Sequence, residues 1–172
     1  LALPAHWRRI DPPGGAAMLD ACAPANASGP QSPLLVALQG EPSGVRFVAV
    51  EAGDGAGVGP LASVNVLERS LDQALSLATF VERNVSMLES SPQVRAPVEQ
   101  TAVTLPAGPG VRLRYRLRAT TGGGAAFELA LTQYLLLRGR HGYVLTGAAP
   151  TASEGDYLPL FEAMAASLRW LR

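Results

Sequence analysis

The sequence predicts an α+β fold in which an antiparallel β-sheet is packed by two main helices. Four strand-like segments follow one another in the second half of the chain, separated by turns too short to join parallel neighbours. Two other segments repeat apolar residues at spacings of three and four, which is typical of amphipathic helices. The 172 residues, 48% hydrophobic and 16% charged, suit one domain with its own core, so we expect a single domain over residues 1–172.

Short strands and turns alternate in the first part of the chain. Clusters of proline and glycine mark turns, among them residues 12–15 and 24–33, a hairpin loop at 40–44 and a glycine-rich loop at 53–60. Between these turns the β-branched and apolar residues predict short strands at residues 7–10, 17–21, 34–38, 45–50 and 62–67.

The first helix is predicted to begin at a capping box formed by Ser70 and Gln73. Ser90-Ser91-Pro92 should end this helix, because proline disfavours helical geometry at the residue before it. The expected inward stripe consists of Leu71, Leu75, Ala78, Val81, Val85 and Leu88.

Four longer strands and a closing helix are predicted next. The strands fall at residues 94–105, 111–119, 125–137 and 143–148, with Gly108-Pro109-Gly110, residues 121–124 and residues 139–142 between them. The helix covers residues 156–171, where Pro159 is acceptable because it lies in the first turn. Its inward stripe consists of Leu158, Phe161, Ala165 and Leu168.

The composition excludes several chemistries. Every one of the 14 basic residues is arginine, so lysine-dependent Schiff-base and P-loop chemistry is ruled out, and the richness in Ala, Gly and Pro is typical of a GC-rich genome. Cys22 is the only cysteine, which excludes an intramolecular disulfide and a site with several thiolates. No apolar run is long enough to span a bilayer. We predict no cofactor and no metal.

Four local stretches resemble the PsbP/Mog-like superfamily. Leu3-Pro4-Ala5-His6-Trp7 resembles its opening P-x-x-W, and Ala62-Ser63-Val64-Asn65-Val66 resembles its P-N-V strand, with Leu61-Ala62 in place of the usual approach. Leu105-Pro106-Ala107-Gly108 followed by Val111-Arg112-Leu113-Arg114-Tyr115 resembles its central hairpin, and residues 157–169 resemble its closing helix. The superfamily includes PsbP, Ran-binding import factors, bacterial DcrB proteins and mycobacterial LpqN-type lipoproteins.

The resemblance implies an α/β/α sandwich and a bacterial, non-catalytic assembly or binding module that binds a protein partner. It also implies a place in the cell envelope or outside the cell. These implications concern fold and tendency, because members of this superfamily bind unrelated partners.

The most unusual pattern is the alternation of arginine with apolar residues in Val111-Arg112-Leu113-Arg114-Tyr115-Arg116-Leu117-Arg118. Side chains alternate across a strand, so the four arginines share one face, which we call the arginine face. They could bind an anion or an acidic partner. They could instead pair with Glu128 and Glu99 on a solvated sheet face, and this interpretation is favoured because exposed antiparallel faces are often charged.

Nucleic acid is not a predicted partner, because the net charge is zero and no aromatic residues interleave with the arginines on their face. Arg138 and Arg140 form a second basic group at a hairpin tip, where a partner contact and a solvated turn are both open.

Catalytic motifs are absent from the sequence. It has no HExxH and no G-x-S-x-G, and residues 53–59 fit neither a dinucleotide nor a phosphate loop. We therefore expect a non-enzymatic interaction or assembly module. The alternative is a carrier with a small hydrophobic ligand in a cavity between sheet and helix. An enzyme would regain support if His6 or His141 lay beside a carboxylate in a cleft.

Overall fold

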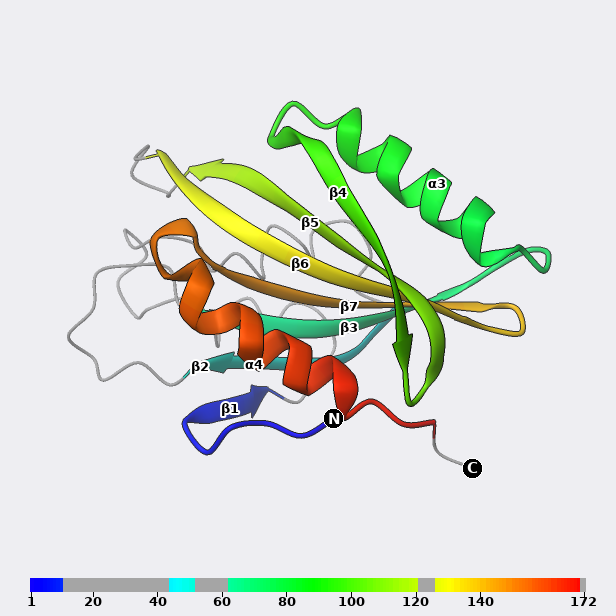
Figure 1. The fold of residues 1–172 in the computed structure, drawn as a ribbon, viewed down its shortest axis with the longest axis horizontal. Coiled ribbons are helices and arrows are strands. Elements are labelled where there is room, and N and C mark those ends of the chain that lie inside the picture. Colours follow the sequence, from blue (N-terminus) through cyan, green and yellow to red (C-terminus); the bar gives the residue numbers. More distant parts are fainter. Residues whose placement is uncertain (11–43, 52–61, 121–125, 171–172) are drawn as a thin grey trace.

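A computed structural model describes residues 1–10, 44–51, 62–120 and 126–170 (Figure 1). The elements are β1 (Trp7–Ile10), β2 (Val45–Glu51), β3 (Ser63–Ser70), α3 (Leu77–Glu89), β4 (Val94–Leu105), β5 (Gly108–Thr120), β6 (Ala126–Arg138), β7 (His141–Pro150), the short 3-10 helix η2 (Thr151–Ser153) and α4 (Glu154–Ala166). The strands predicted at 17–21 and 34–38, the loop at 53–60, most of the hairpin loop at 40–44, and Cys22 lie outside the described residues.

The described strands form one seven-stranded sheet in the order β1-β2-β3-β7-β6-β5-β4. Every neighbouring pair is antiparallel, as the short predicted turns required. The strands β4 to β7 form a consecutive meander, and β3 joins this meander by pairing with β7. The predicted α+β fold with an antiparallel sheet is confirmed.

The two helices cover opposite faces of the sheet, which confirms the α/β/α sandwich. Phe161, Met164 and Ala165 of α4 pack with side chains such as Leu136 and Leu145 on one face. On the other face, α3 contributes its own apolar side chains to a second core cluster that includes Leu113 and Leu135. In Figure 1, α4 crosses the middle of the sheet, and α3 lies near β4.

Two glycines of β7 allow an aromatic ring from each helix to touch the sheet backbone. A Cβ atom at Gly142 would lie 2.5 Å from the ring of Phe80 in α3, and one at Gly147 would lie 2.4 Å from the ring of Phe161 in α4. Both rings are almost fully buried. Glycine at these positions therefore sets how closely each helix approaches the sheet.

The predicted start of the first helix is wrong. Ser70 is the last residue of β3 and pairs with His141, so it cannot cap a helix. The helix α3 begins at Leu77, and the side chain of its N-cap Ser76 accepts a hydrogen bond from the Thr79 backbone N–H at 3.1 Å. Consequently Phe80 is buried where the predicted stripe had Ala78, which is exposed.

Two turns and the last helix also differ from prediction. Gly108 and Gly142 belong to strands, so the turns are tighter than expected and consist of Pro106-Ala107 and Gly139-Arg140, with Gly139 in the left-handed region at φ 60°. The helix α4 starts at Glu154 and ends at Ala166. Pro159 therefore lies beyond the first turn, where its lack of an N–H removes one helical hydrogen bond.

Candidate functional site

The arginine face lies on the side of the sheet that α4 covers. The apolar residues of β5 point to the α3 side, where Leu113 and Tyr115 are buried, so the arginines point to the α4 side. The prediction that the arginines lie on a solvated sheet face is therefore only partly correct. The Arg112 and Arg114 side chains are 23% and 33% exposed, whereas the Arg116 side chain is 54% exposed.

Glutamates of α4 pair with the more covered arginines. Arg112 Nη1 donates to Glu162 Oε1 at 2.5 Å, and Arg114 Nη2 donates to Glu154 Oε1 at 2.6 Å. Arg114 also lies 3.7 Å from Glu99 on β4. Sequence reasoning named Glu99 and Glu128 as partners but missed Glu154 and Glu162, because these two residues come from a helix that is distant in the sequence.

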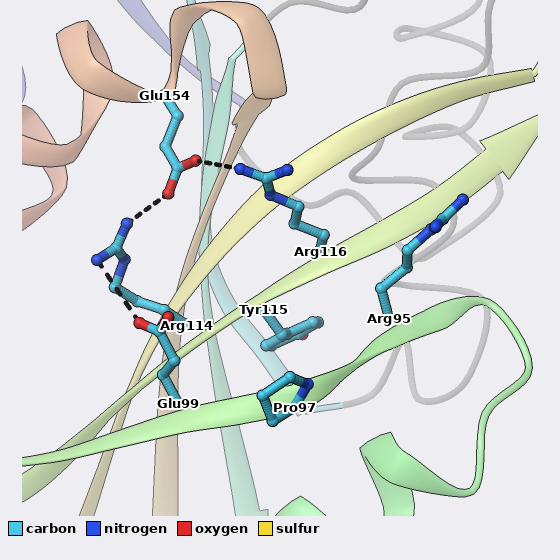
Figure 2. A pocket seen from close by; sticks show the side chains of 7 residues that line it. All are labelled: Arg95, Pro97, Glu99, Arg114, Tyr115, Arg116 and Glu154. Atoms are coloured by element: carbon cyan, nitrogen blue, oxygen red, sulfur yellow. Dashed lines mark hydrogen bonds and ion pairs between the residues drawn. The ribbon is translucent and has the colours of Figure 1, made fainter.

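A bulge in β4 opens a pocket beside the arginine face. Arg95 pairs with Arg116 and Glu99 pairs with Arg114, so β4 has three residues between its paired positions where β5 has one. Pro97 lies in this bulge, where its missing N–H costs no ladder bond. The resulting bulge pocket has a volume of about 340 Å³ and is lined by Arg95, Pro97, Glu99, Arg114, Tyr115, Arg116 and Glu154 (Figure 2).

The mouth of the bulge pocket has two exposed arginines that share one carboxylate. The Arg95 side chain is 62% exposed and lies 3.2 Å from Glu128, which also lies 3.7 Å from Arg116. Arg116 reaches a second carboxylate, Glu154, at 3.7 Å. Figure 2 shows Arg114 and Arg116 reaching the two carboxylate oxygens of Glu154 from different sides, while Arg95 points away from them. Arg118 is exposed and makes no ion pair with another described residue.

Arg114 is partly covered and pairs with two glutamates, one on α4 and one on β4. Its hydrogen bond to Glu154 raises the pKa of Arg114 above its ordinary value, and the charges of Glu99 and Glu162 act in the same direction. The guanidinium joins β5 to the first turn of α4 and to β4, so it links three elements through one side chain.

Replacing Arg114 with glutamine should lower the free energy of unfolding by about 1–2 kcal/mol, because the partly covered Glu154 loses its charge-assisted hydrogen bond. The measurement is urea denaturation followed by circular dichroism. Arg118→Gln is the matched control and should change stability by less than about 0.5 kcal/mol. Equal losses in the two variants would contradict the structural role of Arg114.

The basic hairpin tip is held by contacts within the chain. Arg140 donates hydrogen bonds to the backbone carbonyls of Leu71 and Asp72. The Arg138 guanidinium lies over the ring of Trp170, 5.4 Å from its centroid. These two arginines are far from the bulge pocket in the sheet register, so the structure does not bring all six predicted site arginines together.

Each histidine lies beside a carboxylate. His6 Nε2 is 3.5 Å from Glu51, and His141 Nδ1 is 2.9 Å from Glu68. Glu51 also accepts a hydrogen bond from the Tyr157 hydroxyl. Both histidine side chains are about half exposed, and neither lines the bulge pocket. An enzyme would gain support from a histidine beside a carboxylate in a cleft, and only the neighbouring carboxylate is present at these two histidines.

Within residues 1–10, 44–51, 62–120 and 126–170, no group of three or more His, Cys, Asp or Glu side chains could hold a metal ion. In that same part of the chain, none of the helices combines the length and the apolar character that crossing a membrane requires.

The comparisons with known proteins support the fold alone. No protein-family model matches the chain, and no curated protein matches it. Among solved structures, the fold is similar to LpqN of Mycobacterium tuberculosis, a protein involved in cell envelope biogenesis, with TM-score 0.57 and 14% identity over 98% of this chain and 79% of that one. It is also similar to PA94 of Pseudomonas aeruginosa, a protein of unknown function described as a candidate regulator, with TM-score 0.56 and 16% identity over 69% of this chain and 79% of that one.

Proposed function

We propose that this chain is a non-enzymatic interaction module that binds a protein partner by taking up carboxylate groups at the bulge pocket. The observation that carries the proposal is the pair of exposed guanidinium groups, Arg95 and Arg116, at the mouth of a pocket built from two strands and a helix. Arginine is suited to this role because its planar fork can donate two parallel hydrogen bonds to one carboxylate.

The ion pairs at the pocket mouth can be exchanged at small cost. Arg116 lies 3.7 Å from each of its two glutamates, and pairs this long and this exposed contribute about 0–1 kcal/mol. A carboxylate that meets Arg95 and Arg116 with better geometry would replace Glu128 without breaking the fold. Arg112 and Arg114, with their shorter pairs to α4, would stay in place as support.

The packing gives less support to a carrier of hydrophobic ligands. Phe80 and Phe161 contact the sheet backbone so closely that even a methyl group at Gly142 or Gly147 would collide with them. The bulge pocket itself is lined mostly by charged side chains, whereas a site for a hydrophobic ligand is lined mostly by apolar ones.

The cell envelope is our proposed location. The support is the similarity of fold to LpqN, which takes part in cell envelope biogenesis. A fractionation of host cells would test the location directly.

The test compares two double variants of the tagged protein expressed in its own host. Arg95→Gln with Arg116→Gln should weaken a complex of fixed stoichiometry at least about tenfold, since each charge-assisted hydrogen bond contributes about 1.5–3 kcal/mol. Arg8→Gln with Arg83→Gln removes the same charge from exposed positions elsewhere and should leave the complex intact. Native mass spectrometry identifies the complex, and titration of the purified partner gives the dissociation constant.

Two results would contradict the proposal. A partner held equally well by both double variants would place the binding surface elsewhere. A small molecule of discrete mass, retained by every variant, would favour the carrier.

A further inference from the structure

The strand β4 forms one edge of the described sheet. It is 12 residues long and pairs with β5 on one side, and no described strand pairs with its other side. An edge of this kind presents a row of backbone N–H and C=O groups that an added strand can use. The side chains of Gln100, Thr101, Ala102 and Thr104 are all exposed.

The two halves of this edge differ in how well they are protected against the addition of another strand. The first half has the features with which proteins block strand addition, namely a bulge, Pro97 and the charged Arg95 and Glu99. The second half, residues 100–105, continues in regular register with β5 and contains neither a charge nor a proline. Threonine and valine in this half favour extended pairing.

We propose that an extended segment of the partner adds to the edge of β4 at residues 100–105 and places an acidic side chain in the bulge pocket. This inference rests on the proposed function and specifies the partner's chemistry. The bulge pocket begins at the residues that directly precede the regular half of the strand, and one residue of an extended chain spans about 3.3 Å. A peptide paired along this half therefore brings its next few residues over the pocket.

The pocket lining has three arginines against two glutamates, Glu99 and Glu154, and this excess of positive charge favours an acidic residue. Arg95 and Arg116 share Glu128 at the mouth, and the exposed Arg118 lies opposite Glu128 in the register of β5 and β6. Two arginines thus pair with one carboxylate, and a third lies next to it on the neighbouring strand. Backbone pairing supplies affinity in such strand addition, and a pocket for one side chain supplies selectivity.

The test uses synthetic peptides and the full chain labelled with ¹⁵N. The probes are acetyl-Glu-Thr-Val-Thr-Val-Thr-amide and the reversed order with glutamate last, because the strand can add in either direction. One of them should shift the amide resonances of residues 100–105 or slow the hydrogen exchange of these amides. Replacing glutamate with glutamine in that peptide should weaken binding at least about tenfold.

N-methylation of the peptide separates strand pairing from simple charge attraction. Two versions of the binding peptide are methylated at alternate backbone nitrogens, so that each removes the donors on one edge. Strand addition predicts that one version loses binding and the other retains it. Equal binding of both versions, or no binding by either glutamate peptide at about 1 mM, would overturn the inference.

Ala102→Lys distinguishes this inference from the proposed function. The added charge lies on the exposed edge and should abolish peptide binding, whereas Ser86→Lys on the exposed side of α3 should not. If the natural complex depends on Arg95 and Arg116 but tolerates Ala102→Lys, the proposed function stands and strand addition is wrong. A concentration-dependent dimer that Ala102→Lys dissociates would also overturn it, in favour of a second copy of the chain.

Discussion

Replacing Gly147 with alanine should lower the free energy of unfolding by about 2–3 kcal/mol, within the range for overpacked cores. The new Cβ would lie 2.4 Å from Cγ of Phe161, and this atom is at the base of the ring and cannot swing away. Phe161 is 3% exposed and packs between Trp7 and Tyr157, so α4 itself must move. Urea denaturation measured by fluorescence and circular dichroism gives the loss.

Gly155→Ala is the matched control, because no atom lies within 4 Å of the position that its Cβ would take in α4. This change should stabilise the protein by about 0.5–1 kcal/mol through higher helix propensity. In a Phe161→Ala background, which itself should cost about 3–5 kcal/mol, Gly147→Ala should become nearly neutral. If Gly147→Ala costs the same with and without the ring, the close approach of α4 is not the cause.

Raising the pH above 10 should destabilise the protein steeply. Burial raises the pKa of Tyr115 above its ordinary value of 10.0, and burial together with the hydrogen bond to Glu51 raises the pKa of Tyr157 to about 12. Above pH 10 the unfolded chain loses phenolic protons that the folded chain keeps, so the unfolded state binds fewer protons and stability falls as pH rises. Tyr115 alone should contribute up to about 1.4 kcal/mol per pH unit.

Tyr115→Phe tests this assignment. The variant keeps the buried ring but has no proton to lose, so its stability should fall less between pH 10 and 12, by up to about 1.4 kcal/mol per unit. Denaturation at fixed pH values gives the slope, and absorbance at the tyrosinate band shows when ionisation accompanies unfolding. Identical slopes for the two proteins would mean that Tyr115 ionises while the protein is folded.

The strands could be predicted from the sequence because their signals are local. Alternation of side chains and nearby turn residues located β4 to β7 to within a few residues, although Gly108 and Gly142 were taken as turn residues when they are paired in strands. The start of α3 was missed because Ser70 and Gln73 match a capping box as well as any real one. Only the pairing of Ser70 with His141, which depends on distant chain segments, decides against it.

The arginine face of the candidate site could be predicted from the sequence, whereas its pairing with α4 and the role of Arg95 could not. The alternation of side chains along a strand predicted that the four arginines of β5 share one face and that Glu128 lies on the same face. The pairing with Glu154 and Glu162 depends on where α4 packs, which no local pattern specifies. Arg95 was missed, yet Pro97 within a predicted strand was a signal for a bulge or an edge, and the structure has both at that position.

The strand order also has a consequence for the folding pathway. The described sheet consists of two stretches that are each consecutive along the chain, and the only seam between them is the pairing of β3 with β7. The meander from β4 to β7 needs only short loop closures, so its formation loses little chain entropy. The strands β1 to β3 must then find β7 across the whole meander, so we expect the pairing of β3 with β7 to form after the meander.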